Sequence, residues 1–178
     1  MLPALLILNA FIAGIGLWFM SAQRRMVILD ENANHAMGQI GVQLSGCFDA
    51  LMTLLDLIKC YAADEAETLI ETIQSRRTTI TAKSTPDDVI KQEGVILVAL
   101  RRISIITEQH PELKANENCM KILGAVQIYD NMVQTSCLIY NDCVAKLNRY
   151  IRLFPVSMVA KILGFSQKNY WEDILSQY

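Results

Sequence analysis

Residue types that often bind metals or act as nucleophiles are scattered along this chain of 178 residues. The two histidines, His35 and His110, are far apart, and neither lies in an HExxH motif. Cys137 and Cys143 are six residues apart, which places them on different sides of a helix. Zinc sites need clustered His, Cys or carboxylate ligands at characteristic spacings. The sequence therefore predicts no metal site.

Nucleotide-binding and acid–base chemistry are equally poorly supported. Gly38, Gly41 and Gly46 lie within a helical pattern and lack the Lys-Ser/Thr pair of a phosphate-binding loop, so they indicate helix flexibility or close helix packing. A run of four carboxylates is typical of a solvated helix face: Asp64, Glu65, Glu67 and Glu71. We expect no catalytic residue and no cofactor, and hence a protein that is not an enzyme.

The cysteines indicate the compartment. There are five, an odd number, and no CxxC motif occurs: Cys47, Cys60, Cys119, Cys137 and Cys143. A disulfide framework in a small secreted domain usually has an even count. Five scattered thiols are typical of a reducing compartment.

Asp130 is the polar residue with the most informative position. It interrupts a series of apolar residues predicted to face the protein interior, where a carboxylate is costly unless it is paired. One interpretation is an ion pair with Arg101 or Arg102 that fixes helix register, and another is partial exposure. A third is a functional site, in which the core would house a small-ligand sensor or an uncharacterised enzyme.

Composition excludes some classes of protein. A net charge of -2 gives no basic excess for nucleic-acid binding, and a hydrophobic share of 52% argues against disorder. The apolar excess is concentrated at residues 1–20, where Asn9 is the clearly polar side chain and no residue is charged. Twenty helical residues span about 30 Å, the thickness of a bilayer core.

We interpret this segment as a retained membrane anchor. No basic residue precedes it and no paired small residues form a cleavage site, unlike a signal peptide, which would make the protein a secreted bundle. A buried core helix seldom has so long an uncharged run. Its lipid-facing residues are expected to include Leu5, Leu8, Phe11, Ile12, Ile15 and Trp18. Arg24 and Arg25 follow it and, by the positive-inside tendency, predict a cytoplasmic bundle.

The rest of the chain predicts an all-α fold, an antiparallel bundle of three to four long helices with the N-terminal transmembrane helix. Helical periodicity extends over 24–77, 86–108 and 116–154, with Thr85, Asn116 and Gly164 as end signals. The last stretch holds a heptad series: Leu123, Val126, Asp130, Val133, Cys137, Tyr140, Val144, Leu147, Ile151 and Phe154. The expected divisions are an anchor at 1–22, a bundle at 23–165 and a polar tail at 166–178.

Several segments in order resemble the LemA family of bacterial membrane-anchored proteins. They are QIGVQL (39–44), KCYAADE (59–65), HPELKANEN (110–118), YND (140–142), FP (154–155), GF (164–165) and YWE (170–172). The chain departs from the family where a basic, proline-containing stretch is usual, since SGCFDALMTL (45–54) stands there, and Met132 replaces the arginine of ENR. It therefore resembles a divergent member.

The resemblance implies a helical bundle at the bacterial cytoplasmic (inner) membrane, with no established enzymatic activity. Some members belong to the magnetosome membranes of magnetic bacteria, which implies membrane organisation as one setting. We expect a scaffold that contacts the lipid bilayer and other membrane-associated proteins.

Polar residues in the family-like segments are candidates for partner contacts. They are Asn116, Glu117, Asn118 and Asn141, for which a cap or turn role is the alternative. Ala10 and Gly14 form a small-xxx-small pair that would permit a homo-oligomer. The segment 156–165 is expected to pack on the end of the bundle rather than lie on a membrane surface.

Overall fold

The computed structural model describes residues 2–172, which form helices and no strands. The elements are α1 (Leu2–Ile58), α2 (Ala63–Arg76), α3 (Pro86–Gln109), α4 (Pro111–Ala115), α5 (Glu117–Arg152) and α6 (Val156–Leu163). The expected all-α antiparallel bundle is confirmed.

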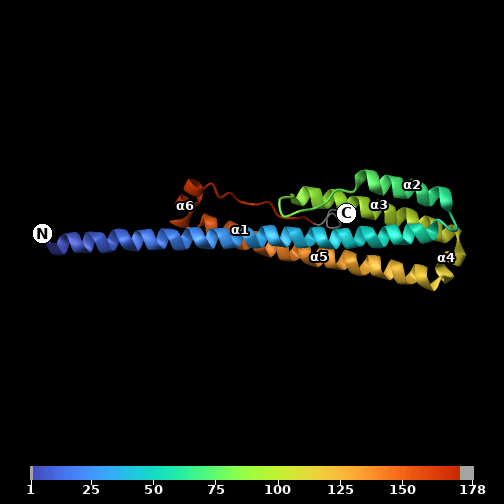
Figure 1. The fold of residues 1–178 in the computed structure, drawn as a ribbon, viewed down its shortest axis with the longest axis horizontal. Coiled ribbons are helices and arrows are strands. Elements are labelled where there is room, and N and C mark those ends of the chain that lie inside the picture. The colour runs from blue at the N-terminus through green and yellow to red at the C-terminus, as the bar shows by residue number, and fades with distance from the viewer. Residues whose placement is uncertain (1, 173–178) are drawn as a thin grey trace.

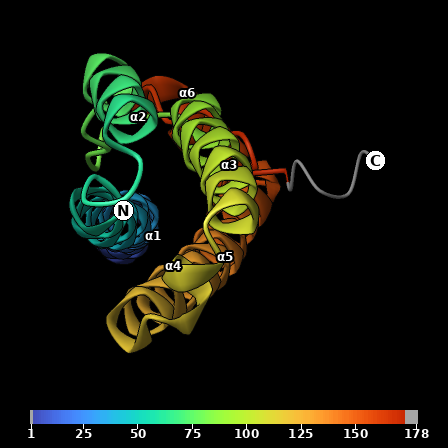
Figure 2. The same cartoon turned by 90° about the vertical axis from the view of Figure 1, so that its right-hand side faces the viewer.

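The bundle is built around α1, which runs the whole length of the molecule (Figure 1). α2 folds back beside it, α3 reverses again, and α5 returns antiparallel to α1. Seen end-on, α2 and α5 lie on opposite sides of the pair formed by α1 and α3 (Figure 2). The most extensive packing joins α1 to α5.

The sequence pattern suggested one helical stretch over 24–77, and this was wrong at one point. The chain turns at residues 59–62, so that α2 folds back against α1. Asp64 and Glu65 lie in the first turn of α2, where they favour the positive end of the helix dipole. The apolar spacing continues through Ile58, Ala62 and Ala66 without a change of phase, so periodicity alone did not reveal the reversal.

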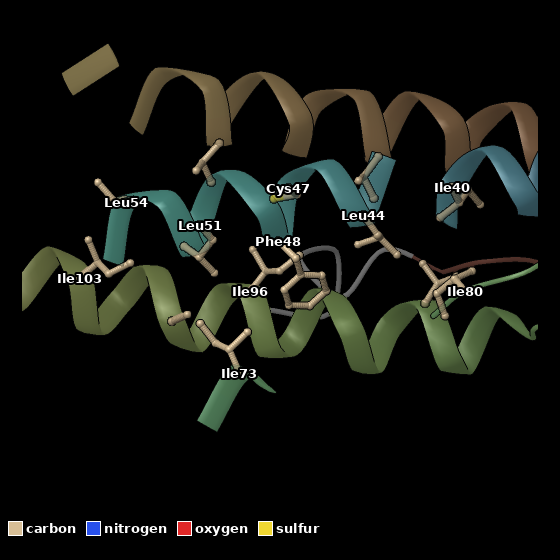
Figure 3. Packing of buried hydrophobic residues seen from close by; sticks show 14 of the residues in the cluster. Ile40, Leu44, Cys47, Phe48, Leu51, Leu54, Ile73, Ile80, Ile96 and Ile103 are labelled. Carbon is tan, nitrogen blue, oxygen red and sulfur yellow. The ribbon is translucent and has the colours of Figure 1, made fainter. Parts of the chain in front are cut away.

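The main core joins α1 to α2, α3 and α5. Phe48 and Leu51 of α1 are buried and lie near Ile96 of α3 and Ile73 of α2 (Figure 3). On the other side of α1, the heptad series of α5 is buried at Val126, Val133, Cys137, Tyr140, Val144, Leu147 and Ile151. The two-sided burial of α1 explains why neighbouring residues are both buried, as at Cys47 and Phe48 and at Leu54 and Leu55, since a single buried face would repeat only every third or fourth position.

Phe154 does not belong to this series, contrary to the expectation. α5 ends at Arg152, two residues earlier, because a residue before a proline disfavours the α conformation. The Phe154 side chain is 80% exposed.

The expected helix ends are confirmed. Thr85 caps α3 in a reciprocal arrangement: its hydroxyl accepts from the Asp88 amide at 3.4 Å, and the Asp88 carboxylate accepts from the Thr85 amide at 3.0 Å. The Thr85 hydroxyl also donates to the Asp88 carboxylate at 2.8 Å, and the two hydrogen bonds that this carboxylate accepts from Thr85 lower the pKa of Asp88. Gly164 ends α6 with φ of 78°, in the left-handed region that favours glycine. Residues 111–115, between α3 and α5, form the short helix α4.

Two of the glycines in α1 permit close packing. The sequence had indicated either this role or helix flexibility for them. A methyl group at Gly41 would overlap the backbone carbonyl oxygen of Ile80, in the loop between α2 and α3. A methyl group at Gly46 would overlap the ring of Tyr129 on α5. Gly38 faces open space.

We predict that Gly41→Ala destabilises the bundle by about 1–3 kcal/mol, because a backbone atom cannot yield as a flexible side chain can. The matched Gly38→Ala variant should instead stabilise it by about 0.5–1 kcal/mol through helix propensity. Chemical unfolding of the full chain, followed by circular dichroism, measures both. Equal effects of the two substitutions would contradict the close approach.

Candidate functional site

The N-terminal part of α1 projects beyond the bundle (Figure 1). α1 is long and apolar enough to cross a membrane. Of the expected lipid-facing residues, Phe11, Ile12, Ile15 and Trp18 are exposed, and the side chains of Leu5 and Leu8 lie outside the described set. The first buried side chain of α1 is that of Ala22, within the described residues. An exposed apolar helix is therefore continuous with the core helix of the bundle.

The arginine pair expected to set the topology lies where this segment enters the bundle. Arg24 and Arg25 are both exposed on α1. The Arg25 guanidinium lies over the ring of Tyr150 on α5, 5.2 Å from its centroid. A cation–π contact of this kind holds the side chain at the end of the bundle.

The second unusual feature is the C-terminal strap, residues 166–172, which runs back along α5 (Figure 1). The side-chain amides of two α5 asparagines hydrogen-bond to the backbone of the strap, much as a neighbouring strand would in a sheet. Asn148 accepts from the Lys168 amide at 3.0 Å and donates to the Lys168 carbonyl at 2.9 Å. Asn141 makes the same pair of hydrogen bonds with Trp171, both at 2.8 Å.

The spacing of these clamps has a simple geometric cause. Asn141 and Asn148 are seven residues apart, about 10.5 Å along a helix. Lys168 and Trp171 are three residues apart, about 10 Å along an extended chain. Two helical turns therefore match three extended residues, and both amide side chains reach the strap at once.

Side chains of the strap extend the contact to the other helices. Lys168 Nζ donates to Asn34 Oδ1 at 2.6 Å and lies 3.1 Å from Asp30 Oδ1, both on α1. Trp171 is 5% exposed, and its Nε1 donates to Glu93 Oε2 of α3 at 3.0 Å. The strap thus ties α1, α3 and α5 together.

Sequence reasoning identified only part of this arrangement. Asn141 was a candidate for a buried polar or partner contact, and the contact that the structure gives it is with the strap. Tyr140 also contacts the strap, because its hydroxyl donates to the Asn169 carbonyl at 3.1 Å. Two family-like segments, YND and YWE, therefore meet. Asn148 and Lys168 were missed, although two asparagines at a heptad spacing on one helix face were a usable signal.

Asp130 is half-buried, which fits the interpretation of partial exposure. It lies near α1: burial, together with the Asp130 charge, raises the pKa of the Cys47 thiol to about 12. Arg101 and Arg102 are exposed on α3, and Arg102 lines a groove between α2 and α3. The structure places Asp130 at the contact between α1 and α5.

The other candidate residues lie at the opposite end of the bundle. Asn116 caps α5, accepting from the amides of Asn118 and Cys119 at 3.0 and 3.2 Å. Its Nδ2 also donates to the Tyr61 hydroxyl at 3.3 Å, which joins the KANEN and KCYAADE segments. Glu117 and Asn118 are exposed. The structure thus supports a capping role for Asn116 and leaves its two neighbours on the surface.

The buried polar side chains of the described residues, Gln92, Thr107 and Asn148, make separate local contacts. Gln92 accepts from the Thr78 amide and donates to the Arg76 carbonyl, which fixes the loop after α2. Thr107 donates to the carbonyl of Ser104 within α3, and Asn148 holds the strap. The groove between α2 and α3, of about 470 Å³, is open at the surface and lined by Asp64, Glu65, Thr68, Leu69, Arg102, Ile105, Ile106 and Gln109.

We predict that Asn141→Ala with Asn148→Ala releases the strap, because four hydrogen bonds are lost at about 0.5–1.5 kcal/mol each. In a Trp18→Phe background, Trp171 is the only tryptophan. Its fluorescence emission should shift to longer wavelength in the double variant, because the released indole enters water. Asn131→Ala, an exposed site on the same helix, is the control. Unchanged Trp171 emission in the double variant would disprove the clamp.

No curated protein matches the chain. Residues 36–177 match the LemA family model, a range that includes most of the bundle, both asparagine clamps and the strap. The chain belongs to the LemA family.

Proposed function

We propose that this protein is a single-pass membrane-anchored scaffold, without enzymatic activity, whose bundle holds other membrane-associated proteins. The observation that carries the proposal is the continuity of α1, which is exposed and apolar over residues 10–18 and has one side buried in the bundle from Ala22 onward. A helix without a break transmits the orientation of its membrane span to everything packed on it. A rigid, anchored bundle of this kind would hold its partner proteins in a fixed orientation at the membrane, which is a role in membrane organisation.

The proposed orientation places the bundle in the cytoplasm, at the bacterial inner membrane. Arg24 and Arg25 immediately follow the apolar segment, and cationic residues close to a span favour the cytoplasmic side. Five cysteines that form no disulfide within the described chain are compatible with a reducing compartment.

The surface that we assign to partners is the outer face of α5. Ile128, Met132 and Ile139 are exposed and lie within about 40° of one another around the helix, on a different side from the buried heptad series. Exposed apolar side chains that share one face of a helix are candidates for an interaction surface. We name these three residues the α5 outer stripe.

The anchor and its orientation can be tested with the native thiol of Cys60, which is exposed near the far end of α1. The full chain should stay in the membrane pellet after alkaline extraction. In cells, a membrane-impermeant maleimide should label Cys60 only after the inner membrane is opened, and Cys60→Ser should remove that labelling. Labelling in cells with a sealed inner membrane would reverse the orientation, and extraction into the soluble fraction would refute the anchor.

The partner surface can be tested by photo-crosslinking in native membranes. Benzoylphenylalanine at Ile139 should give adducts of discrete mass, which should disappear when Ile128→Glu and Met132→Glu are added. The same probe at Glu71, exposed on α2, is the control and should give none. Adducts that persist in the double variant, or that are equal at Glu71, would place the contact elsewhere.

A further inference from the structure

The segment between α5 and the strap has two apolar faces. Val156, Val159 and Ala160 of α6 are buried against Met26 of α1 and Ile151 of α5. This packing was predicted from the sequence, and it uses one side of α6. The other side, with the turn before it, exposes Leu153, Phe154, Met158 and Ile162.

These exposed side chains are large and form an apolar strip on α6 and the turn before it. Met158 and Ile162 are four residues apart on one face of α6, and Phe154 lies in the preceding turn; Phe154, Met158 and Ile162 are 80%, 59% and 74% exposed. In water, each would leave most of its apolar surface solvated. A strip of this kind on a short helix whose other face is already packed is typical of an element that lies in a membrane interface.

Its place in the fold brings it to the proposed membrane surface. α6 lies at the end of the bundle from which the apolar part of α1 projects (Figure 1). Phe19, near the end of the uncharged segment, is partly buried in the same cluster as Val156 and Met26. Met26 is six residues beyond Met20, only about 9 Å along the helix.

The charge distribution indicates which kind of membrane surface the α6 end of the bundle would contact. Residues 1–29 and 143–171 contain seven cations and no carboxylate, whereas the rest of the chain holds all 18 carboxylates. Five of the cations are exposed at the end of the bundle where α6 lies: Arg24, Arg25, Arg149, Arg152 and Lys161. Basic residues beside an apolar strip are the combination that binds anionic phospholipid.

We infer that α6 and the turn before it form a second membrane contact, in which Phe154, Met158 and Ile162 enter the headgroup region of an anionic leaflet. The five cations bind the lipid phosphates around them. This inference rests on the proposed anchor, since α1 brings α6 to the bilayer. With two points of contact, the bundle is held at a fixed tilt and rotation.

The test places a fluorescent amino acid at one site of the full chain, reconstituted in vesicles of phosphatidylcholine and phosphatidylglycerol. Lipids with brominated acyl chains then quench probes that enter the bilayer. Probes at Phe154 and Ile162 should lose emission by about twofold, as expected for side chains about 5–10 Å inside the headgroup boundary. A probe at Ile128, equally apolar but on the middle of α5, should not be quenched.

A probe at Ile15 separates this inference from the proposed function. Quenching at Ile15 without quenching at Phe154 and Ile162 would overturn the membrane contact of α6 and leave the anchor intact. Loss of quenching at all three sites would overturn both. Replacing Arg149, Arg152 and Lys161 with glutamine should weaken quenching at Phe154 but not at Ile15, and an unchanged Phe154 signal would refute the role of the cations.

Discussion

The packing of α5 against α1 is the contact on which the rest of the structure depends. α1 is a single helix of 57 residues, and its part beyond Ala22 gains its buried surface from α5 on one side and from α2 and α3 on the other. Isolated helices are marginal in water, so most of the stability of α1 comes from this packing. Gly41 and Gly46 lower the helix propensity of α1, but because they lack a side chain, the loop at Ile80 and the ring of Tyr129 approach the helix closely.

The strap completes the bundle with polar contacts rather than apolar ones. Asn141 and Asn148 pair with both backbone groups of Trp171 and Lys168, so an extended segment is held without a partner strand. Side chains of the same segment reach α1 and α3. Because the strap follows α6 directly, it also holds the end of the bundle where α6 packs.

The sequence was sufficient for the helical fold, the caps and most of the α5 heptad series, because periodicity and end signals are local properties. It was insufficient for the turn at residues 59–62, where the apolar spacing continues in phase through the reversal. The strap was missed for a different reason. Residues 166–172 look polar in sequence, and the burial of Trp171 depends on Asn141 and Glu93, which are distant along the chain.

The central claim is that the proposed membrane span and the bundle are one rigid body along α1. It is tested most directly by the distance between spin labels on non-natural residues at Asn9 and Glu31, both exposed, with the full chain in bilayer nanodiscs. An unbroken helix predicts a single narrow distribution near about 33 Å between the two backbone positions. A broad distribution, or a clearly shorter distance, would show a hinge between span and bundle and would contradict the account.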